Sequence, residues 1–239
     1  MSLLEMQDIH LTLGKTPVLD GVSLNMNRHE FVSILGPSGA GKSSLFRLLT
    51  GAVMPDSGTI TLEDRPLDVA TRPFAFMPQR DALLPWARIL DNVTLGLEVQ
   101  GMPRAQARAQ VLPLLPDFGL EGCANLYPSQ LSGGMRQRAA LLRTVVQDKP
   151  VLLLDEPFGA LDALTRMGMQ RWLKARWAQA RWTTLLVTHD VREAVTLSDR
   201  IYVLSRRPAR VIFEMATTGR DPAILETEIL DILFTQTGD

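Results

Sequence analysis

Apolar residues occur in short continuous runs that alternate with helix-like periodicities along the chain. The continuous runs predict strands buried on both faces of a parallel sheet, at residues 31–35, 151–154 and 184–188. Apolar positions at helical spacing come after these runs and predict helices at 44–50, 163–181 and 191–197. Strands that alternate with helices in this way indicate an α/β core built on a parallel sheet.

Shorter apolar segments predict antiparallel structure beside that core. Residues 3–13 and 18–26 flank a turn at 14–17 and are typical of two paired strands. Further short strands are expected at 59–62 and 74–77, and a closing hairpin at 201–204 and 210–215. The first two strands therefore predict a small antiparallel β layer.

Between these parts the pattern becomes helical. Helices are expected at 89–99, at 103–112 and inside 126–146, and Pro113 and Pro116 should end or kink the second of them. We therefore expect one domain over 1–239, with a core at 1–80 and 148–219 and a helical subdomain at 81–147. The tail, 220–239, predicts one amphipathic helix with its apolar side formed by Ile224, Leu225, Ile229 and Ile232.

Composition removes several classes of protein. The 239 residues are 46% hydrophobic and 21% charged, which is typical of a globular core and not of a disordered chain. The net charge of −1 gives no support for nucleic-acid binding. The single cysteine, Cys123, excludes an internal disulfide and fits a reducing compartment. Residues 1–10 lack a signal-peptide pattern, and no apolar run approaches the ~18 residues that span a bilayer.

The stretch between strand 31–35 and helix 44–50 carries the clearest chemistry. It reads Gly36-Pro37-Ser38-Gly39-Ala40-Gly41-Lys42-Ser43 and fits the phosphate-binding loop G-x-x-x-x-G-K-S/T. Backbone N–H groups from about Gly39 to Ser44 are expected to point at phosphates, helped by the helix N-terminus. Lys42 should reach the β- and γ-phosphates, and the Ser43 hydroxyl should bind Mg²⁺. The alternative is a chance glycine-rich turn, which the flanking strand and helix disfavour.

A second cluster of candidate residues follows strand 151–154. Asp155 stands at the strand tip, where its carboxylate can hold Mg²⁺ directly or through water. Glu156 comes one residue later and can activate water opposite the γ-phosphate. A strand that ends in two acids therefore supplies a metal ligand and a general base.

A third stretch predicts a second anion site. Ser132, Gly133 and Gly134 begin a helix with a serine cap and exposed backbone donors. One chain does not need two such sites for one triphosphate. A head-to-tail dimer does, if each nucleotide is held by the loop of one subunit and the serine–glycine turn of the other.

Taken together, the chain resembles the ATP-binding subunit of an ABC transporter over essentially its whole length. Residues 36–43 resemble Walker A, 131–137 (Leu-Ser-Gly-Gly-Met-Arg-Gln) the ABC signature, and 151–156 Walker B. Gln79 matches the Q-loop, Asp162 the D-loop and His189 the switch histidine. The resemblance implies an α/β P-loop NTPase (RecA-like) core with an antiparallel β layer and an inserted ABC-type helical subdomain.

The resemblance also implies roles for single residues. Glu156 would be the general base, and His189 would contact the γ-phosphate. Gln79 would sense Mg²⁺ and the attacking water, and Asp162 would couple two composite sites in a nucleotide-sandwich dimer. Ser132, Gly133, Gly134 and Gln137 would bind the nucleotide held by the other subunit. Each residue has a structural alternative; Asp162, for example, could simply cap helix 163–181.

Two positions depart from the family pattern. The family usually has an aromatic residue where Leu13 stands, so the adenine would be covered by a side chain without a π face. It often has glycine where His29 stands, so that turn must accommodate a side chain. Neither position touches the hydrolytic residues, and an active ATPase is expected.

Further short matches indicate which branch of the family the chain resembles. Residues 157–166 resemble prokaryotic importers, and Leu83-Leu84-Pro85-Trp86 resembles the nitrate, sulfonate and taurine branch, which includes transporters of thiamine precursors. The expected partners are a second ATPase subunit (a homodimer or a pair), permease subunits and an extracytoplasmic solute-binding protein, with no nucleic acid. The expected location is peripheral, at the cytoplasmic face of the inner membrane. An exporter ATPase and a soluble non-transport ABC ATPase are the alternatives.

Overall fold

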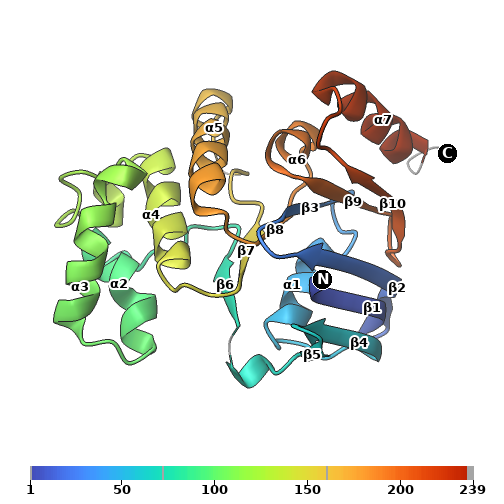
Figure 1. Cartoon of the computed structure of the whole chain (residues 1–239), viewed down its shortest axis with the longest axis horizontal. Helices are drawn as coiled ribbons and strands as arrows, with labels where there is room; N and C mark the ends of the chain where they lie inside the picture. The colour runs from blue at the N-terminus through green and yellow to red at the C-terminus, as the bar shows by residue number, and fades with distance from the viewer. Residues whose placement is uncertain (1, 72, 160, 236–239) are drawn as a thin grey trace. The chain divides into compact units, whose positions relative to one another are not determined.

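The computed structural model describes residues 2–71, 73–159 and 161–235 (Figure 1). Its packing divides the chain into two compact units. Unit 1 comprises residues 1–74 and 174–239, and unit 2 comprises residues 75–173. Unit 2 is wider than the helical insertion expected at 81–147, because it also holds two strands and the first part of a long helix.

The predicted antiparallel layer is present in unit 1. Strands β1 (Ser2–Leu13) and β2 (Thr16–Asn27) pair antiparallel, and β1 also pairs with β4 (Ser57–Leu62). The short edge strand β5 (Arg65–Pro66), which the sequence did not predict, completes the order β2-β1-β4-β5 (Figure 1). The buried side chains of β1 are those of Leu3, Leu4, Met6, Ile9 and Leu11, so the strand contributes apolar side chains to the core of unit 1.

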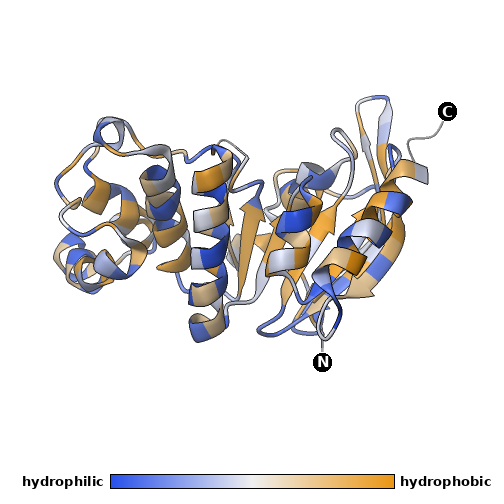
Figure 2. Ribbon diagram, turned by 90° about the horizontal axis from the view of Figure 1, so that it is seen from above, coloured by the Kyte–Doolittle hydropathy of each residue, from blue (hydrophilic) through white to orange (hydrophobic). Residues whose placement is uncertain are grey.

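The parallel strands of unit 1 run β9-β3-β8, with β10 antiparallel at the edge beside β9. Their bounds are Phe31–Leu35 (β3), Thr184–Val187 (β8), Arg200–Leu204 (β9) and Val211–Ala216 (β10). Every residue of β3 and β8 is buried, and Figure 2 colours these central strands largely as hydrophobic. The continuous apolar runs in the sequence therefore predicted fully covered strands correctly.

Unit 1 also contains the helices α1 (Lys42–Leu49), α6 (Val191–Leu197) and α7 (Pro222–Thr235). Leu225 and Ile229 of α7 are buried in a cluster with α6, β9 and β10, and Ile232 packs against it. The expected tail helix is confirmed for residues 222–235, and residues 236–239 lie outside the described residues. Ile224 was assigned to the apolar side but is 57% exposed, because at ~100° per residue it lies more than a quarter of a turn away from the buried Leu225 and Ile229.

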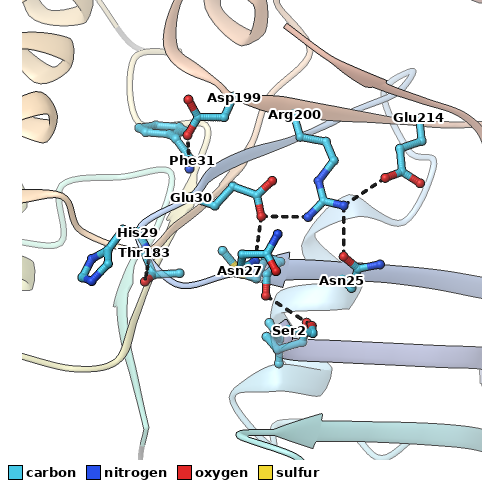
Figure 3. Close-up of polar contacts among 12 residues, drawn as sticks. Ser2, Asn25, Asn27, His29, Glu30, Phe31, Thr183, Asp199, Arg200 and Glu214 are labelled. Carbon is cyan, nitrogen blue, oxygen red and sulfur yellow. Dashed lines mark hydrogen bonds and ion pairs between the residues drawn. The ribbon is translucent and has the colours of Figure 1, made fainter. Parts of the chain in front are cut away.

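A polar network ties the two sheets of unit 1 together (Figure 3). The Arg200 guanidinium on β9 donates to Glu30 (2.7 Å), to Asn25 on β2 (3.0 Å) and to Glu214 on β10 (3.0 Å). Nearby, the departure from family glycine at His29 is accommodated with a left-handed φ of 59°. His29 N–H donates to Thr183 Oγ1 at 2.9 Å, so this turn is anchored to the start of β8.

Unit 2 contains the helices predicted for the insertion. They are α2 (Ile89–Val99), α3 (Arg104–Val111) and α4 (Gly133–Val145), joined by 3₁₀ turns at Leu112–Leu114, Pro116–Phe118 and Pro128–Gln130 (Figure 1). The two prolines end α3 as expected. Strands β6 (Phe74–Met77) and β7 (Val151–Asp155) are neighbours, and α5 (Ala163–Ala180) begins in this unit. Within the described ranges, no helix has the length and apolar character needed to cross a membrane.

Candidate active site

The predicted phosphate-binding loop lies between β3 and α1 in unit 1. Residues Gly36 to Gly41 form the loop, and Lys42 is the first residue of α1. The Lys42 ammonium donates to the carbonyl oxygens of Gly36 (2.7 Å) and Pro37 (3.0 Å), which places its charge inside the curve of the loop. Ser43 is exposed and Ser44 buried. A strand, a turn around a lysine charge and a helix N-terminus are the parts of a phosphate site.

Position 41 of the loop requires a glycine for two reasons. Its φ is 110°, outside the range that side-chain-bearing residues favour. A Cβ atom here would lie 2.8 Å from Val18 Cγ1, so the loop packs directly on β2. Glycine at position 41 therefore allows the backbone of the loop to pack directly against β2, where a side chain would not fit.

Two further predicted residues lie in unit 1. Leu13 is the last residue of β1 and is half-buried beside the turn at 14–15. His189 is exposed in the loop from β8 to α6. Its neighbours are fixed: Thr188 Oγ1 donates to the buried Glu193 carboxylate at 2.8 Å, and Asp190 caps α6 by accepting from Glu193 N–H at 3.1 Å. Glu193 was not predicted from the sequence, although an acid four residues after His189 is a signal that could have found it.

In unit 2 two predicted catalytic residues meet. Asp155 ends β7 and is half-buried, and Glu156 follows it with a left-handed φ of 43°. The Gln79 amide, just beyond β6, donates from Nε2 to Glu156 Oε2 at 2.8 Å. Glutamate adopts positive φ at a cost, and such outliers concentrate at functional sites. The strand tip therefore presents a carboxylate that is already oriented by an amide.

The predicted signature turn is a capped helix N-terminus. Ser132 is the N-cap of α4, and its Oγ accepts from Met135 N–H at 3.3 Å. A Cβ on Gly134 would lie 2.8 Å from Thr165 Cγ2, so glycine is needed here for close packing on α5. Beside it is a hollow of about 260 Å³ lined by Arg80, Asp81, Gly133, Arg136, Gln137 and Leu161. Gln137 is 4% exposed, and its Oε1 has no hydrogen-bond partner within the described part of the chain.

Asp162 caps α5, which is the structural alternative that the sequence left open for it. Its Oδ1 accepts from Thr165 N–H at 3.0 Å and so caps the start of α5. Hydrogen bonds from Thr165 hold the pKa of Asp162 below its ordinary value. The carboxylate that caps α5 is thus ionised at neutral pH.

The donor atoms predicted for Mg²⁺ suit that ion. Ser43 offers a hydroxyl, Asp155 a carboxylate and Gln79 an amide oxygen, and Mg²⁺ prefers hard oxygen ligands, with phosphates supplying others. Ser43 belongs to unit 1, whereas Asp155 and Gln79 belong to unit 2. The residue types present therefore fit a magnesium-bound nucleotide.

Fold and site define the class of protein: a parallel α/β core with this loop after β3 is that of a P-loop NTPase. Residues 19–159 match the ABC transporter family. The chain therefore belongs to that family, and it is an ATPase.

Similar proteins agree with this assignment. The formylaminopyrimidine import ATP-binding protein ThiZ of Halalkalibacterium halodurans is 45% identical over 82% of this chain and 76% of its own. The taurine import ATP-binding protein TauB of Pseudomonas putida is 39% identical over 99% of this chain and 97% of its own. A dimeric ATP-binding cassette in a post-hydrolysis state with ADP and Pi superposes with a TM-score of 0.76, at 29% identity, over 91% of this chain and all of that one. The expected fold class and the resemblance to the taurine and thiamine-precursor branch are confirmed.

Proposed function

We propose that this chain hydrolyses Mg²⁺-bound ATP as the energy-coupling subunit of an importer for a small solute of the nitrate, sulfonate, taurine or thiamine-precursor type. The observation that carries the proposal is the 2.8 Å hydrogen bond between Gln79 and Glu156. It joins a residue at the end of β6 to the acid at the end of β7. An amide and a carboxylate arranged in this way can orient water and accept its proton.

Each residue has a defined task in the proposed hydrolysis. Glu156 accepts a proton from the attacking water, and Gln79 holds the carboxylate in place. The loop N–H groups and Lys42 bind the phosphates, and His189 contacts the γ-phosphate. Ser43, Asp155 and Gln79 would hold Mg²⁺, which when bound supplies positive charge to the phosphates.

A second copy of the chain completes each nucleotide site in this proposal. The capped N-terminus of α4 offers donors from Gly133 and Gly134 to the phosphates bound by the partner subunit. Gln137 Oε1, buried and unsatisfied in the described chain, is suited to accept from a hydroxyl group of that nucleotide. Asp162 would sense its counterpart across the dimer. The dimeric state of the similar cassette supports this arrangement.

The permease is proposed to dock near Trp86. Leu83 is 7% exposed and packs inside unit 2, whereas Trp86 is 74% exposed. A large aromatic side chain that is left in solvent is a common anchor in protein interfaces. The complex would lie at the cytoplasmic face of the inner membrane, with an extracytoplasmic solute-binding protein delivering the solute.

Reconstitution with the permease tests the proposal. The chain and the permease encoded beside its gene would be placed in vesicles, and solute uptake and phosphate release measured with and without ATP. Uptake that requires ATP, and that Glu156→Gln abolishes, is the expected result. A chain that hydrolyses ATP but neither binds the permease nor drives uptake would point to a soluble ATPase, and ATP-driven efflux to an exporter.

Trp86→Ala tests the docking site separately. The exposed ring contributes little to folding, so the melting temperature and ATP binding of the isolated chain should stay near wild type. Complex formation and uptake should weaken, since loss of an aromatic anchor typically costs ~2 kcal/mol or more in an interface. Exposed Val99→Ala in the same unit is the matched control. Unchanged uptake in Trp86→Ala would place the permease elsewhere.

A further inference from the structure

Two arginines of α4 hold the segment between Gln79 and α2. Arg143 donates from Nη2 to the Asp81 carbonyl oxygen (2.6 Å) and from Nη1 to the Ala82 carbonyl oxygen (2.7 Å). About two helical turns earlier, Arg136 donates from Nε to the Asp81 carboxylate (3.1 Å) and from Nη1 to the Leu131 carbonyl oxygen (2.9 Å). The backbone at residues 81–82 is therefore attached to the helix that begins with the signature turn.

The held backbone is in an uncommon conformation. Ala82 has a φ of 47°, in the left-handed region that a residue with a Cβ atom rarely adopts. Arg143 grips the two carbonyl groups on either side of the Ala82 nitrogen and Cα with its planar fork, a geometry that a lysine ammonium does not reproduce. Asp81 Oδ1 also accepts from Leu83 N–H at 3.1 Å. The turn is thus held both by Arg143 of α4 and by the side chain of Asp81 within the turn.

The other end of the segment is fixed to α2. Asn92 is fully buried; its Oδ1 accepts from Leu84 N–H (2.6 Å), and its Nδ2 donates to the carbonyl oxygens of Leu84 and Ala87 (both 3.1 Å). Trp86 stands between these anchors and is exposed. A displacement of residues 81–82 would therefore be transmitted to Trp86 through a short segment that is hydrogen-bonded at both ends.

We propose that Arg143 is a coupling residue that converts movement of α4 into movement of the Trp86 segment. The inference rests on the proposed function. Ser132 and Arg143 are eleven residues apart, so Arg143 lies ~16 Å along α4 from the turn that would meet the partner's nucleotide. Arg143 is a positioning residue: its guanidinium donates to the carbonyl oxygens of Asp81 and Ala82, and it acts through the strained turn at Ala82.

The test compares variants in the reconstituted permease complex, with solute transported per ATP hydrolysed as the readout. Arg143→Lys keeps the positive charge but loses the pair of guanidinium N–H donors. The amount of solute transported per ATP hydrolysed should fall by about 2- to 30-fold, the range expected for residues in coupled networks. The basal ATPase and melting temperature of the isolated chain should stay near wild type. Arg138→Lys is the matched control on the same helix, because Arg138 packs over Trp172 at 5.6 Å; its ratio should not change.

A second variant keeps the test decisive if Arg143→Lys does not fold. Ala82→Gly keeps both carbonyl groups and accepts positive φ without strain, but it makes the turn compliant. Its transport-to-hydrolysis ratio should fall in the same direction. A wild-type ratio in Ala82→Gly and in any folded Arg143→Lys overturns the coupling role. Absence of ATP-driven transport by the wild-type complex overturns the proposed function instead, so the two failures are distinguishable.

Discussion

The side-chain amide of Gln79 donates a hydrogen bond to the carboxylate of Glu156, with 2.8 Å between Nε2 and Oε2. The two residues are 77 positions apart in the sequence, and each follows the end of a strand. The contact holds one oxygen of the Glu156 carboxylate in a fixed position. Chemistry at Glu156 is therefore tied to the position of the Gln79 segment.

Glu156→Gln should abolish steady-state ATP hydrolysis while leaving ATP binding intact. A glutamine side chain can still accept the hydrogen bond from Gln79, but it cannot take a proton from water. Loss of a general base typically lowers the rate ~10²–10⁴-fold. Phosphate release measures this directly, with exposed Glu121→Gln in the same unit as a control of normal rate. Turnover near wild type in Glu156→Gln would refute the assignment.

The phosphate loop offers a matched pair of glycine variants. Gly41→Ala introduces a Cβ 2.8 Å from Val18 Cγ1, whereas Gly39→Ala meets nothing within 4 Å. Both residues have positive φ, so each change carries the backbone cost of ~1–2 kcal/mol. Only Gly41→Ala adds a clash that must move the loop or β2. Calorimetric titration with ATP and melting curves should show the larger loss for Gly41→Ala, and equal losses would contradict this packing.

Leu13→Tyr should tighten ATP binding. Leu13 is half-buried at the end of β1 and provides no aromatic face for a base. Base–aromatic stacking contributes ~1–3 kcal/mol, of which a leucine recovers only the burial part. Wild type should therefore discriminate weakly between ATP and GTP, and the tyrosine variant should favour ATP more. A neutral or weakened titration would show that the base lies against another side chain.

Acid should weaken the junction of α2 and α3. Asp91 accepts from Arg104 (2.8 Å) and Arg108 (2.5 Å). Burial raises the pKa of Asp91, but the hydrogen bonds from Arg108 and Arg104 outweigh it and hold the pKa below the ordinary value of 3.8. A depressed carboxyl pKa in the folded state contributes stability above pH ~4, and this stability is lost as pH falls through the folded value.

Asp91→Asn should therefore lower the free energy of unfolding by about 1 kcal/mol at pH 7. The difference from wild type should shrink as the pH falls below the ordinary carboxyl value, where wild type also loses the charge. Urea unfolding at several pH values measures it, with exposed Asp231→Asn on α7 as the control. A difference that stays constant down to pH 2 would show that the two ion pairs contribute nothing.

Local periodicity predicted most elements because each is decided by nearby residues. The helix at Ile89–Val99 and the strand at Phe31–Leu35 match their predicted bounds, and Ser132 caps α4 as its residue type indicates. The two-residue strand β5 was missed because it is too short to show a period. The side of α7 assigned to Ile224 was also wrong, because apolar residues occur on more than one side of this helix and do not reveal which stripe is buried.

Long-range relationships lay beyond the sequence pattern. The motifs identified Gln79 and Glu156 separately, but their hydrogen bond depends on the neighbouring ends of β6 and β7. Nothing in the residue types of Ala82 or Glu156 predicts positive φ, because that conformation is imposed by tertiary contacts such as those of Arg143. The residues for chemistry could thus be predicted, and the contacts that orient them could not.

In the proposed dimer, ATP is held between the phosphate loop of one chain and the signature turn of another. The most direct measurement is the mass of Glu156→Gln in solution, by analytical ultracentrifugation, with ATP and with ADP. A dimer is expected with ATP and a monomer with ADP. Adding Ser132→Arg should leave ATP binding intact but keep the chain monomeric, because the arginine blocks the N-terminus of α4. A monomer with saturating ATP, or an ATP-dependent dimer that forms equally well with Ser132→Arg, would contradict the proposed dimer.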